Sequence, residues 1–329
     1  MRNCNSARIF SGLVLAAGIA LAMNTVANAD YPEKPITVIY PWAPGDPVDT
    51  VLRTLGEQAS QELGQPFVIN NVQGAGGAKS MTAGATAEPD GYTLLNNWVA
   101  PQIGAKLFNP DLPYDNDSYI PIAGVMAIPF TLTVPADHPA DDIQGFVSWA
   151  NEKGTPLNYG VCAPQSVPRL VGEQFMRSAG VAYNPIPFSG GCMGDNITGL
   201  ANGSLDAAVS VVPATTRFAG QVKHLGLLTD ERHALAPDLA TAKEQGIELG
   251  WGNVALGWGG LVVPKETPDD RVALLQESLG EIIQSDAFAT ALGDLAPMIK
   301  YVPPEDFQEL WSRSMVLLEP HVTQLKASN

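Results

Sequence analysis

The chain has 329 residues, of which 34 are acidic and 18 are lysine or arginine, so its formal net charge at pH 7 is −16. Nucleic acids and anionic membrane surfaces bind basic patches, and this charge balance therefore argues against both as partners. The length suffices for two domains of ordinary size or for one large domain.

The first predicted element is a signal peptide at residues 1–29. Arg2 and Arg8 precede an apolar run at residues 9–23, and residues 27–29 form a small-x-small cleavage site. A retained membrane anchor is the less favoured alternative, because a membrane-spanning helix needs about 20 apolar residues. We expect cleavage after Ala29 and export to the periplasm. Loss of the two arginines then changes the formal charge from −16 to −18.

After the signal peptide, short apolar runs alternate with helix-like segments, which is typical of α/β proteins with mostly parallel sheets. Strands are predicted at residues 36–40, 67–69, 92–95, 130–134, 157–161, 207–212, 225–228 and 261–263. Four helices are predicted. The first contains the apolar stripe Val51, Leu52, Leu55, Ala59 and Leu63, and the second runs from Ser166 to Gly180. The third has Thr267 as N-cap and Pro268 as its first residue, and the fourth covers residues 304–318. No long linker interrupts the chain, so we expect two α/β lobes of which one is discontinuous.

Loops rich in glycine, proline and small polar residues follow several of these strands, at 41–49, 73–80, 96–98, 162–166 and 189–192. Such loops share the carboxyl edge of a parallel sheet, where ligands bind. Helix N-termini at that edge carry a partial positive charge and bind anions. In the first loop, Trp42 offers an apolar wall and Gly45 allows close backbone approach; the alternative is a tight turn in which Asp49 caps the next helix. The glycine-rich loop departs from the phosphate-loop and dinucleotide patterns, so we do not expect nucleotide binding.

Cys162 and Cys192 are the two cysteines that remain after the signal peptide. An even pair in an oxidising compartment favours a disulfide, with two free thiols as the alternative. The four histidines show no metal-ligand spacing, and we expect neither a metal nor a cofactor. No nucleophile stands beside a histidine or in a G-x-S-x-G turn, which argues against an enzyme.

Five segments together resemble the substrate-binding proteins of tripartite tricarboxylate transporters, the TctC or Bug type. They are YPEKPITVIYPWAPGDPVDT, QPFVINNVQGAGGA, PDGYTLL, YG…SVPRLVGEQF and GWGGLVVPKETP. The resemblance covers nearly all of the mature chain in order. It implies a periplasmic binding protein with two lobes. We expect one lobe at 30–125 plus 250–329 and the other at 126–249, with crossovers near 122–130 and 249–256, in a monomeric protein. Both lobes would close on a small organic carboxylate.

The resemblance also implies delivery of this carboxylate to a membrane permease with one large and one small subunit. A receptor that presents its ligand to a sensor kinase is the alternative, and a periplasmic enzyme is less favoured. Backbone N–H groups of the first-lobe loops would grip the ligand. By position, the implied ligand-binding residues are Trp42, Pro44, Gly45, Asp46, Asp49, Gly76, Gly77, Asn97, Trp98, Pro164, Gln165, Ser166, Ser189, Gly190, Gly191 and Ser210.

Three departures from the family pattern bear on the ligand. Asp46 and Pro47 replace Gly-Ser, which adds a carboxylate and removes one amide donor. Arg169 stands where a histidine is common and supplies either a cation or an outward salt bridge. Ser210 replaces an aspartate, so a counter-charge for a ligand amino group is missing. We therefore expect a di- or tricarboxylate or an aromatic carboxylate without a free amine.

Overall fold

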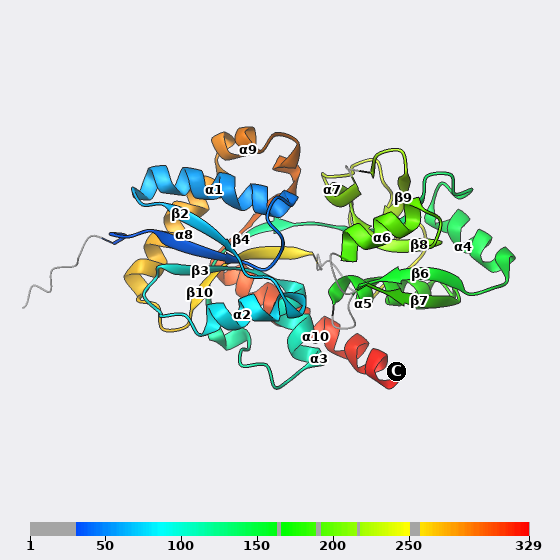
Figure 1. Cartoon of the computed structure of the whole chain (residues 1–329), viewed down its shortest axis with the longest axis horizontal. Helices are drawn as coiled ribbons and strands as arrows, with labels where there is room; N and C mark the ends of the chain where they lie inside the picture. Colours follow the sequence, from blue (N-terminus) through cyan, green and yellow to red (C-terminus); the bar gives the residue numbers. More distant parts are fainter. Residues whose placement is uncertain (1–30, 163–165, 189–191, 216–217, 251–256, 329) are drawn as a thin grey trace, which may run out of the picture.

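The computed structural model describes residues 31–162, 166–188, 192–215, 218–250 and 257–328. They form two lobes side by side, each built around one β-sheet with helices packed against it (Figure 1). The predicted two-lobed α/β fold is therefore confirmed. The predicted signal peptide and its cleavage site lie outside the described residues.

The first lobe contains a six-stranded sheet in the order β11-β4-β10-β3-β1-β2. Its strands are β1 (Ile36–Tyr40), β2 (Phe67–Asn71), β3 (Thr93–Trp98), β4 (Tyr119–Ala127), β10 (Trp258–Pro264) and β11 (Ile299–Val302). One face is covered by α1 (Pro47–Leu63), α8 (Asp269–Gln284) and α9 (Asp286–Leu292), and the other by α2 (Ala78–Ala85) and the start of α10 (Pro304–Ser328) (Figure 1). Helix α1 buries Val51, Leu52, Leu55 and Ala59, because their spacing places them on one helix face.

The second lobe contains a five-stranded sheet in the order β7-β6-β8-β5-β9. Its strands are β5 (Phe130–Pro135), β6 (Leu157–Val161), β7 (Tyr183–Pro187), β8 (Ala207–Val211) and β9 (Val222–Leu227). Helices α4 (Ile143–Lys153) and α5 (Val167–Ser178) pack on one face, and α6 (Cys192–Ala201) packs on the other. The four-residue helix α7 (Val212–Thr215) follows β8 directly.

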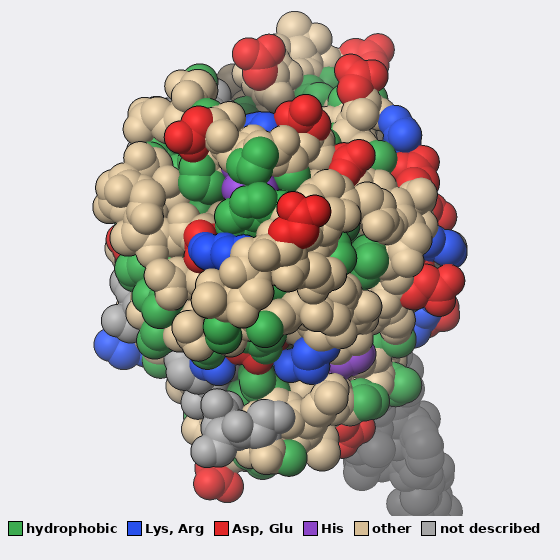
Figure 2. All heavy atoms as spheres, turned by 90° about the vertical axis from the view of Figure 1, so that its right-hand side faces the viewer, with side chains coloured by type: hydrophobic (Ala, Val, Ile, Leu, Met, Phe, Trp, Pro, Cys, Tyr) green, Lys and Arg blue, Asp and Glu red, His purple; other side chains and the backbone are tan. Residues whose placement is uncertain are grey.

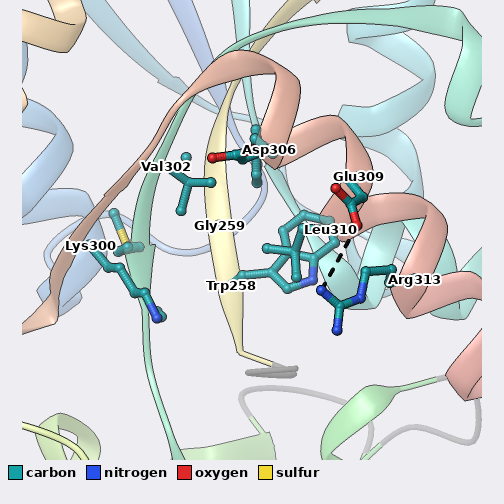
Figure 3. Close-up of a pocket in the computed structure, with 12 residues that line it drawn as sticks. Trp258, Gly259, Lys300, Val302, Asp306, Glu309, Leu310 and Arg313 are labelled. Atoms are coloured by element: carbon teal, nitrogen blue, oxygen red, sulfur yellow. Dashed lines mark ion pairs between the residues drawn. The ribbon is translucent and has the colours of Figure 1, made fainter. Parts of the chain in front are cut away.

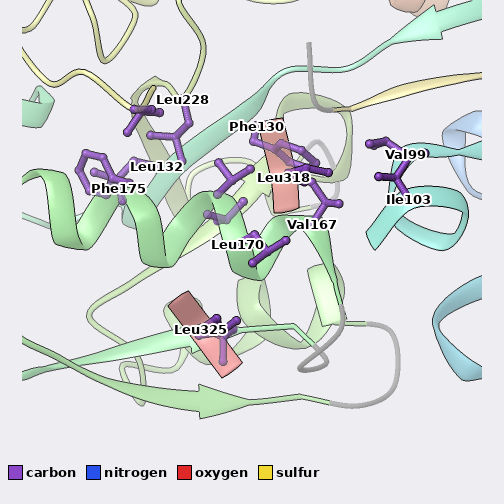
Figure 4. Packing of buried hydrophobic residues seen from close by; sticks show 14 of the residues in the cluster. Val99, Ile103, Phe130, Leu132, Val167, Leu170, Phe175, Leu228, Leu318 and Leu325 are labelled. Atoms are coloured by element: carbon purple, nitrogen blue, oxygen red, sulfur yellow. The ribbon is translucent and has the colours of Figure 1, made fainter. Parts of the chain in front are cut away.

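Two crossings and a helix connect the lobes. Strand β4 ends at Ala127 in the first sheet and β5 begins at Phe130 in the second, close to the predicted crossover. The chain returns between β9 and β10, where residues 251–256 lie outside the described part. Helix α10 begins in the first lobe, and its Leu318 and Leu325 share one buried cluster with Leu170 of α5 (Figure 4). This helix continues to Ser328, although the sequence predicted its end at 318.

Most strands of each sheet run in one direction, as predicted, and each sheet is mixed because the remaining strands run against them. In the first lobe β10 runs antiparallel to both β3 and β4, and in the second β5 runs antiparallel to β8 and β9. The physical reason lies in the crossings. Strand β10 returns from the second lobe, so it runs against β1 to β4; strand β5 enters the second lobe, so it runs against the other four strands there.

The remaining elements include four short ones: η1 (Ala75–Gly77), η2 (Ala100–Gly104), α3 (Ala105–Phe108) and η3 (Asn116–Ser118). Helix α8 begins one residue later than predicted, with Pro268 as N-cap, because the Thr267 hydroxyl donates to the Pro264 carbonyl at 2.7 Å. Within the described residues, no helix has both the length and the apolar character needed to cross a membrane. Acidic side chains are scattered over the face of the second lobe in Figure 2, with fewer basic ones between them.

Candidate ligand-binding site

The strand directions bring the loops of both lobes to one interlobe edge. Strand β4 runs toward the second lobe, so the parallel strands β1, β2 and β3 also end at the edge that faces this lobe. Strand β5 begins at the crossing, so β6, β7 and β8, which run opposite to it, end toward the first lobe. The predicted ligand loops follow these six strands. The topology therefore brings the predicted ligand loops to the edge where the two lobes meet.

Contacts across this edge agree with the topology. Val211 at the end of β8 packs against the buried cluster of the first lobe, which includes Val38 and Leu52. Val99 and Ile103 lie in the same cluster as Val167, the first residue of α5 (Figure 4). The loop after β3 and the start of α5 are thus close together.

In the first predicted ligand loop, residues 41–49, Asp46 caps helix α1. Asp46 is the N-cap of α1 and accepts a hydrogen bond from the Asp49 N–H at 2.7 Å. The Tyr40 hydroxyl donates to both oxygens of the same carboxylate, at 2.9 and 2.8 Å. Burial raises the pKa of Asp46, although these hydrogen bonds oppose the shift. The first turn of α1 therefore already holds an anion that belongs to the protein.

Asp49 is not the helix cap, so the alternative in which Asp49 caps α1 is wrong. Its carboxylate is buried, accepts from the Gly45 N–H at 2.9 Å and pairs with Arg53 at 2.8 Å. The Asn71 amide donates to it at 3.0 Å. Burial raises the pKa of Asp49, but the bonds from Arg53, Gly45 and Asn71 outweigh burial and lower it overall. Both aspartates of the loop thus organise the loop itself. Trp42 and Pro44 lie beside them, half-buried and exposed respectively.

The glycine-rich loop is arranged differently. Gly74, Gly76 and Gly77 have φ of 133°, 63° and 93°, values that favour glycine. A Cβ on Gly77 would lie 2.7 Å from the Cβ of Pro101 and 3.4 Å from that of Pro41, so this loop abuts the segments after β3 and β1. Helix α2 begins directly afterwards and has no side-chain cap. Its N-terminus is therefore a positively polarised helix end at the interlobe edge without a protein carboxylate on it.

Lys79 lies in the first turn of α2, and the sequence analysis did not include it in the site. Its side chain folds back along the loop, since a Cβ on Gly74 would lie 3.1 Å from Lys79 Nζ. Within the described part of the chain, this ammonium group makes no hydrogen bond or ion pair. An exposed cation beside an uncapped helix N-terminus is suited to an anion.

Asn97 and Trp98 of the third loop are turned into the protein. Asn97 is fully buried and donates to the Gln102 side chain, while its Oδ1 has no partner among the described residues. The Trp98 indole donates to Asn96 Oδ1 at 2.6 Å, and its ring lies against Gly259. Trp98 is only 8% exposed, so it supports this edge and offers little surface to a ligand.

In the second lobe, Ser166 is the N-cap of α5 and accepts from the Arg169 N–H at 3.4 Å. Ser210 is fully buried, and its hydroxyl has no partner among the described residues. The side chain of Cys192 lies outside the described residues, so the disulfide to Cys162 stays a prediction. The other second-lobe candidates, Pro164, Gln165, Ser189, Gly190 and Gly191, also lie outside the described residues.

Arg169 is neither an outward salt bridge nor a cation for the ligand. Its Nε donates to Glu173 Oε1 at 2.6 Å, and the two side chains are 8% and 3% exposed. The Tyr183 hydroxyl donates to the other oxygen of Glu173 at 3.1 Å. The arginine therefore neutralises a carboxylate inside the second lobe, because a buried charge needs a partner.

A cavity of about 250 Å³ lies on the α10 side of the first sheet, between β11, the end of β4, the start of β10 and α10 (Figure 3). Trp258, Val302 and Phe307 form its apolar lining, and Lys300 and Arg313 lie at its rim. We do not assign the ligand to it, because it is bounded by β4, β10 and β11 and by none of the predicted ligand loops. Among the described residues, no group of three histidines, cysteines or carboxylates could hold a metal ion.

Known proteins agree with this architecture. Residues 51–306 match the family described as tripartite tricarboxylate transporter family receptor (TctC). The chain is 30% identical over 288 residues to protein BugT of Bordetella pertussis, covering 85% of this chain and 86% of BugT. It is 29% identical to MatC of Rhodopseudomonas palustris, solved with bound malate, with a TM-score of 0.73 and coverage of 89% of this chain and 100% of MatC. A second solved periplasmic transporter is 28% identical with a TM-score of 0.75, covering 89% of this chain and 98% of its own. The chain therefore belongs to the TctC family of periplasmic substrate-binding receptors.

Proposed function

We propose that this protein captures a small organic carboxylate between its lobes and delivers it to a permease of the tripartite tricarboxylate type. The observation that carries the proposal is the N-terminus of α2 at the interlobe edge, which has no side-chain cap, with Lys79 beside it, whose ammonium group has no partner among the described residues. A helix end and a cation can hold a carboxylate even in a protein of high negative charge, because both act at short range.

The other charges near the edge support a carboxylate as ligand. The carboxylates of Asp46 and Asp49 accept hydrogen bonds from protein groups in and beside the first loop. Arg169 forms an ion pair with Glu173. Ser210 places an uncharged hydroxyl where a carboxylate would bind an amino group. We therefore propose a di- or tricarboxylate or an aromatic carboxylate without a free amine. Malate in the related MatC, at 29% identity, is consistent with a dicarboxylate.

Export and domain organisation complete the proposal. We propose that residues 1–29 are cleaved after Ala29 and that the mature protein acts in the periplasm as a monomer. The lobes would comprise residues 30–125 with 250–329, and residues 126–249. They would swing about the two crossings, as in other two-lobed proteins that close around a ligand. A receptor of this kind has no catalytic role.

Calorimetric titration with malate, succinate, citrate, benzoate and aspartate tests the ligand class. We expect binding of a di- or tricarboxylate or of benzoate. Tight binding of aspartate alone, or of no acid at all, would contradict the proposal.

Lys79→Gln tests the position of the site. Losing one charge-assisted hydrogen bond should weaken binding of the preferred acid by about tenfold or more. Lys265→Gln is the matched control, since it removes the same charge from an exposed turn after β10, at the far edge of the sheet. An unchanged affinity in Lys79→Gln would place the carboxylate elsewhere.

A further inference from the structure

A chain of hydrogen bonds runs through the second lobe from β5 across β9 to α7. Thr131 Oγ1 lies 3.0 Å from Thr133 Oγ1, which in turn lies 2.9 Å from His224 Nδ1. On the other side of the ring, His224 Nε2 lies 2.9 Å from Thr215 Oγ1. Both Thr131 and Thr133 are fully buried. One imidazole thus joins the centre of the sheet to the short helix α7.

The donors in this chain can be assigned. The Thr215 hydroxyl donates its proton to the Val212 carbonyl at 2.8 Å, so its oxygen can only accept from His224. His224 Nε2 therefore carries the proton, and Nδ1 accepts from the Thr133 hydroxyl. Thr133 in turn accepts from Thr131. For a neutral ring, the Nε2–H form is the only tautomer in which every bond has one donor and one acceptor, whereas a protonated ring would instead donate from Nδ1 to Thr133.

The surroundings of the ring agree with a neutral histidine. Burial lowers the pKa of His224 to about 4, and no charged group among the described residues contributes to the shift. The adjacent Lys223 pairs with Asp141 at 2.8 Å and does not contact the ring. In this environment the imidazole is a fixed structural connector over the whole neutral pH range.

The hydrogen-bonded chain ends at α7, beside the interlobe edge at which β8 ends. Helix α7 follows β8 without a break, and Val211 at the junction packs against the buried cluster of the first lobe. Ser210, whose buried hydroxyl has no partner among the described residues, directly precedes Val211. Helix α7 is therefore continuous with the end of β8 that contacts the first lobe.

We propose that His224, as the Nε2–H tautomer, is a positioning residue that holds α7 and the end of β8 in the geometry needed for ligand binding. The role in binding rests on the function proposed above. The hold on α7 does not, because the hydrogen bonds exist without ligand.

The first test needs no ligand. Thr215→Val keeps the side-chain shape but removes the acceptor, whereas Thr215→Ser keeps the hydroxyl. We expect hydrogen exchange at residues 211–215 to rise at least tenfold in Thr215→Val and to stay near wild type in Thr215→Ser. Thr198→Val is the matched control, since its hydroxyl also donates to a backbone carbonyl, that of Gly194 at 2.9 Å, but does not contact His224. Imidazole ¹⁵N shifts should show His224 protonated at Nε2, and protonation at Nδ1 would overturn the assignment.

The second test is calorimetric titration with malate. We expect Thr215→Val to weaken binding about three- to tenfold and Thr215→Ser to restore it, in line with the loss of one hydrogen bond. Raised exchange with unchanged affinity would show that α7 is held but does not position the site. Unchanged exchange would overturn the proposal outright. If the wild-type protein binds no malate, the ligand proposal fails, and the exchange and ¹⁵N results still decide whether His224 holds α7.

Discussion

Replacing Arg169 with methionine removes one partner of a buried ion pair. Arg169 and Glu173 are 8% and 3% exposed, and their charged groups lie 2.6 Å apart. Breaking such a pair costs about 3–5 kcal/mol, because the remaining charge stays buried without compensation. Glu173 keeps the Tyr183 hydroxyl at 3.1 Å and Arg177 at 3.5 Å, which offset part of this cost. We therefore expect Arg169→Met to lower the free energy of unfolding by about 3 kcal/mol.

Urea unfolding followed by circular dichroism measures this loss. The double variant Arg169→Met with Glu173→Leu removes both charges, and it should recover to within about 1 kcal/mol of wild type because apolar replacements tolerate burial. Arg313→Met is the exposed control, since its pair with Glu309 is 4.0 Å apart and both groups are more than half exposed. It should change stability by no more than about 0.5 kcal/mol. A loss below about 1 kcal/mol in Arg169→Met, or a double variant no more stable than the single one, would refute the reasoning.

Three further predictions concern pH, backbone geometry and the disulfide. Because burial lowers the pKa of His224 from 6.5 to about 4, the folded state binds fewer protons than the unfolded state between these values, and stability falls as the pH is lowered. At 1.36 kcal/mol per pKa unit, His224 should lower the free energy of unfolding by about 2.5 kcal/mol between about pH 7.5 and 4.5. Urea unfolding of His224→Gln should show a stability loss over this pH range that is smaller by about this amount. An equal loss in His224→Gln and wild type would contradict the prediction. Gly77→Ala places a Cβ 2.7 Å from a proline side chain of η2, at a residue whose φ is 93°. It should therefore lower the melting temperature more than Gly180→Ala, because Gly180 has a φ of 67° and open space around it. Equal melting temperatures of the two variants would be inconsistent with this packing. A Cys162–Cys192 disulfide closes a loop of roughly 30 residues and should contribute about 3–4 kcal/mol. Thiol titration of the unfolded protein without residues 1–29 and without reductant should detect no free thiol, and two thiols would disprove the bridge.

Local patterns predicted much of the fold. Strands β1 and β6 have the predicted bounds of 36–40 and 157–161, because β-branched and apolar runs flanked by turn residues mark a strand locally. The direction of β5 and β10 depends on which lobe each strand comes from, and no local pattern encodes that. The end of α10 was predicted too early. Pro320 lies inside the helix, and the buried Val322 and Leu325 beyond it continue the apolar face.

The candidate site was predicted at the level of loops rather than of side chains. Composition and family resemblance located the loops after β1, β2 and β3, and the topology brings them to one edge. Both Asp46 and Asp49 fit an N-cap by sequence, and only the tertiary bond from Tyr40 and the pair with Arg53 decide between them. Lys79 was missed because a single exposed lysine carries no sequence pattern. Its significance comes from the absence of a partner in the described structure.

A crystal structure of the protein grown with its tightest-binding carboxylate tests the central claim most directly. The account predicts a carboxylate group at the N-terminus of α2, within hydrogen-bond distance of a backbone N–H of the first turn or of Lys79 Nζ. A carboxylate bound in the cavity beside Trp258 and Arg313, with the N-terminus of α2 left to water, would contradict it.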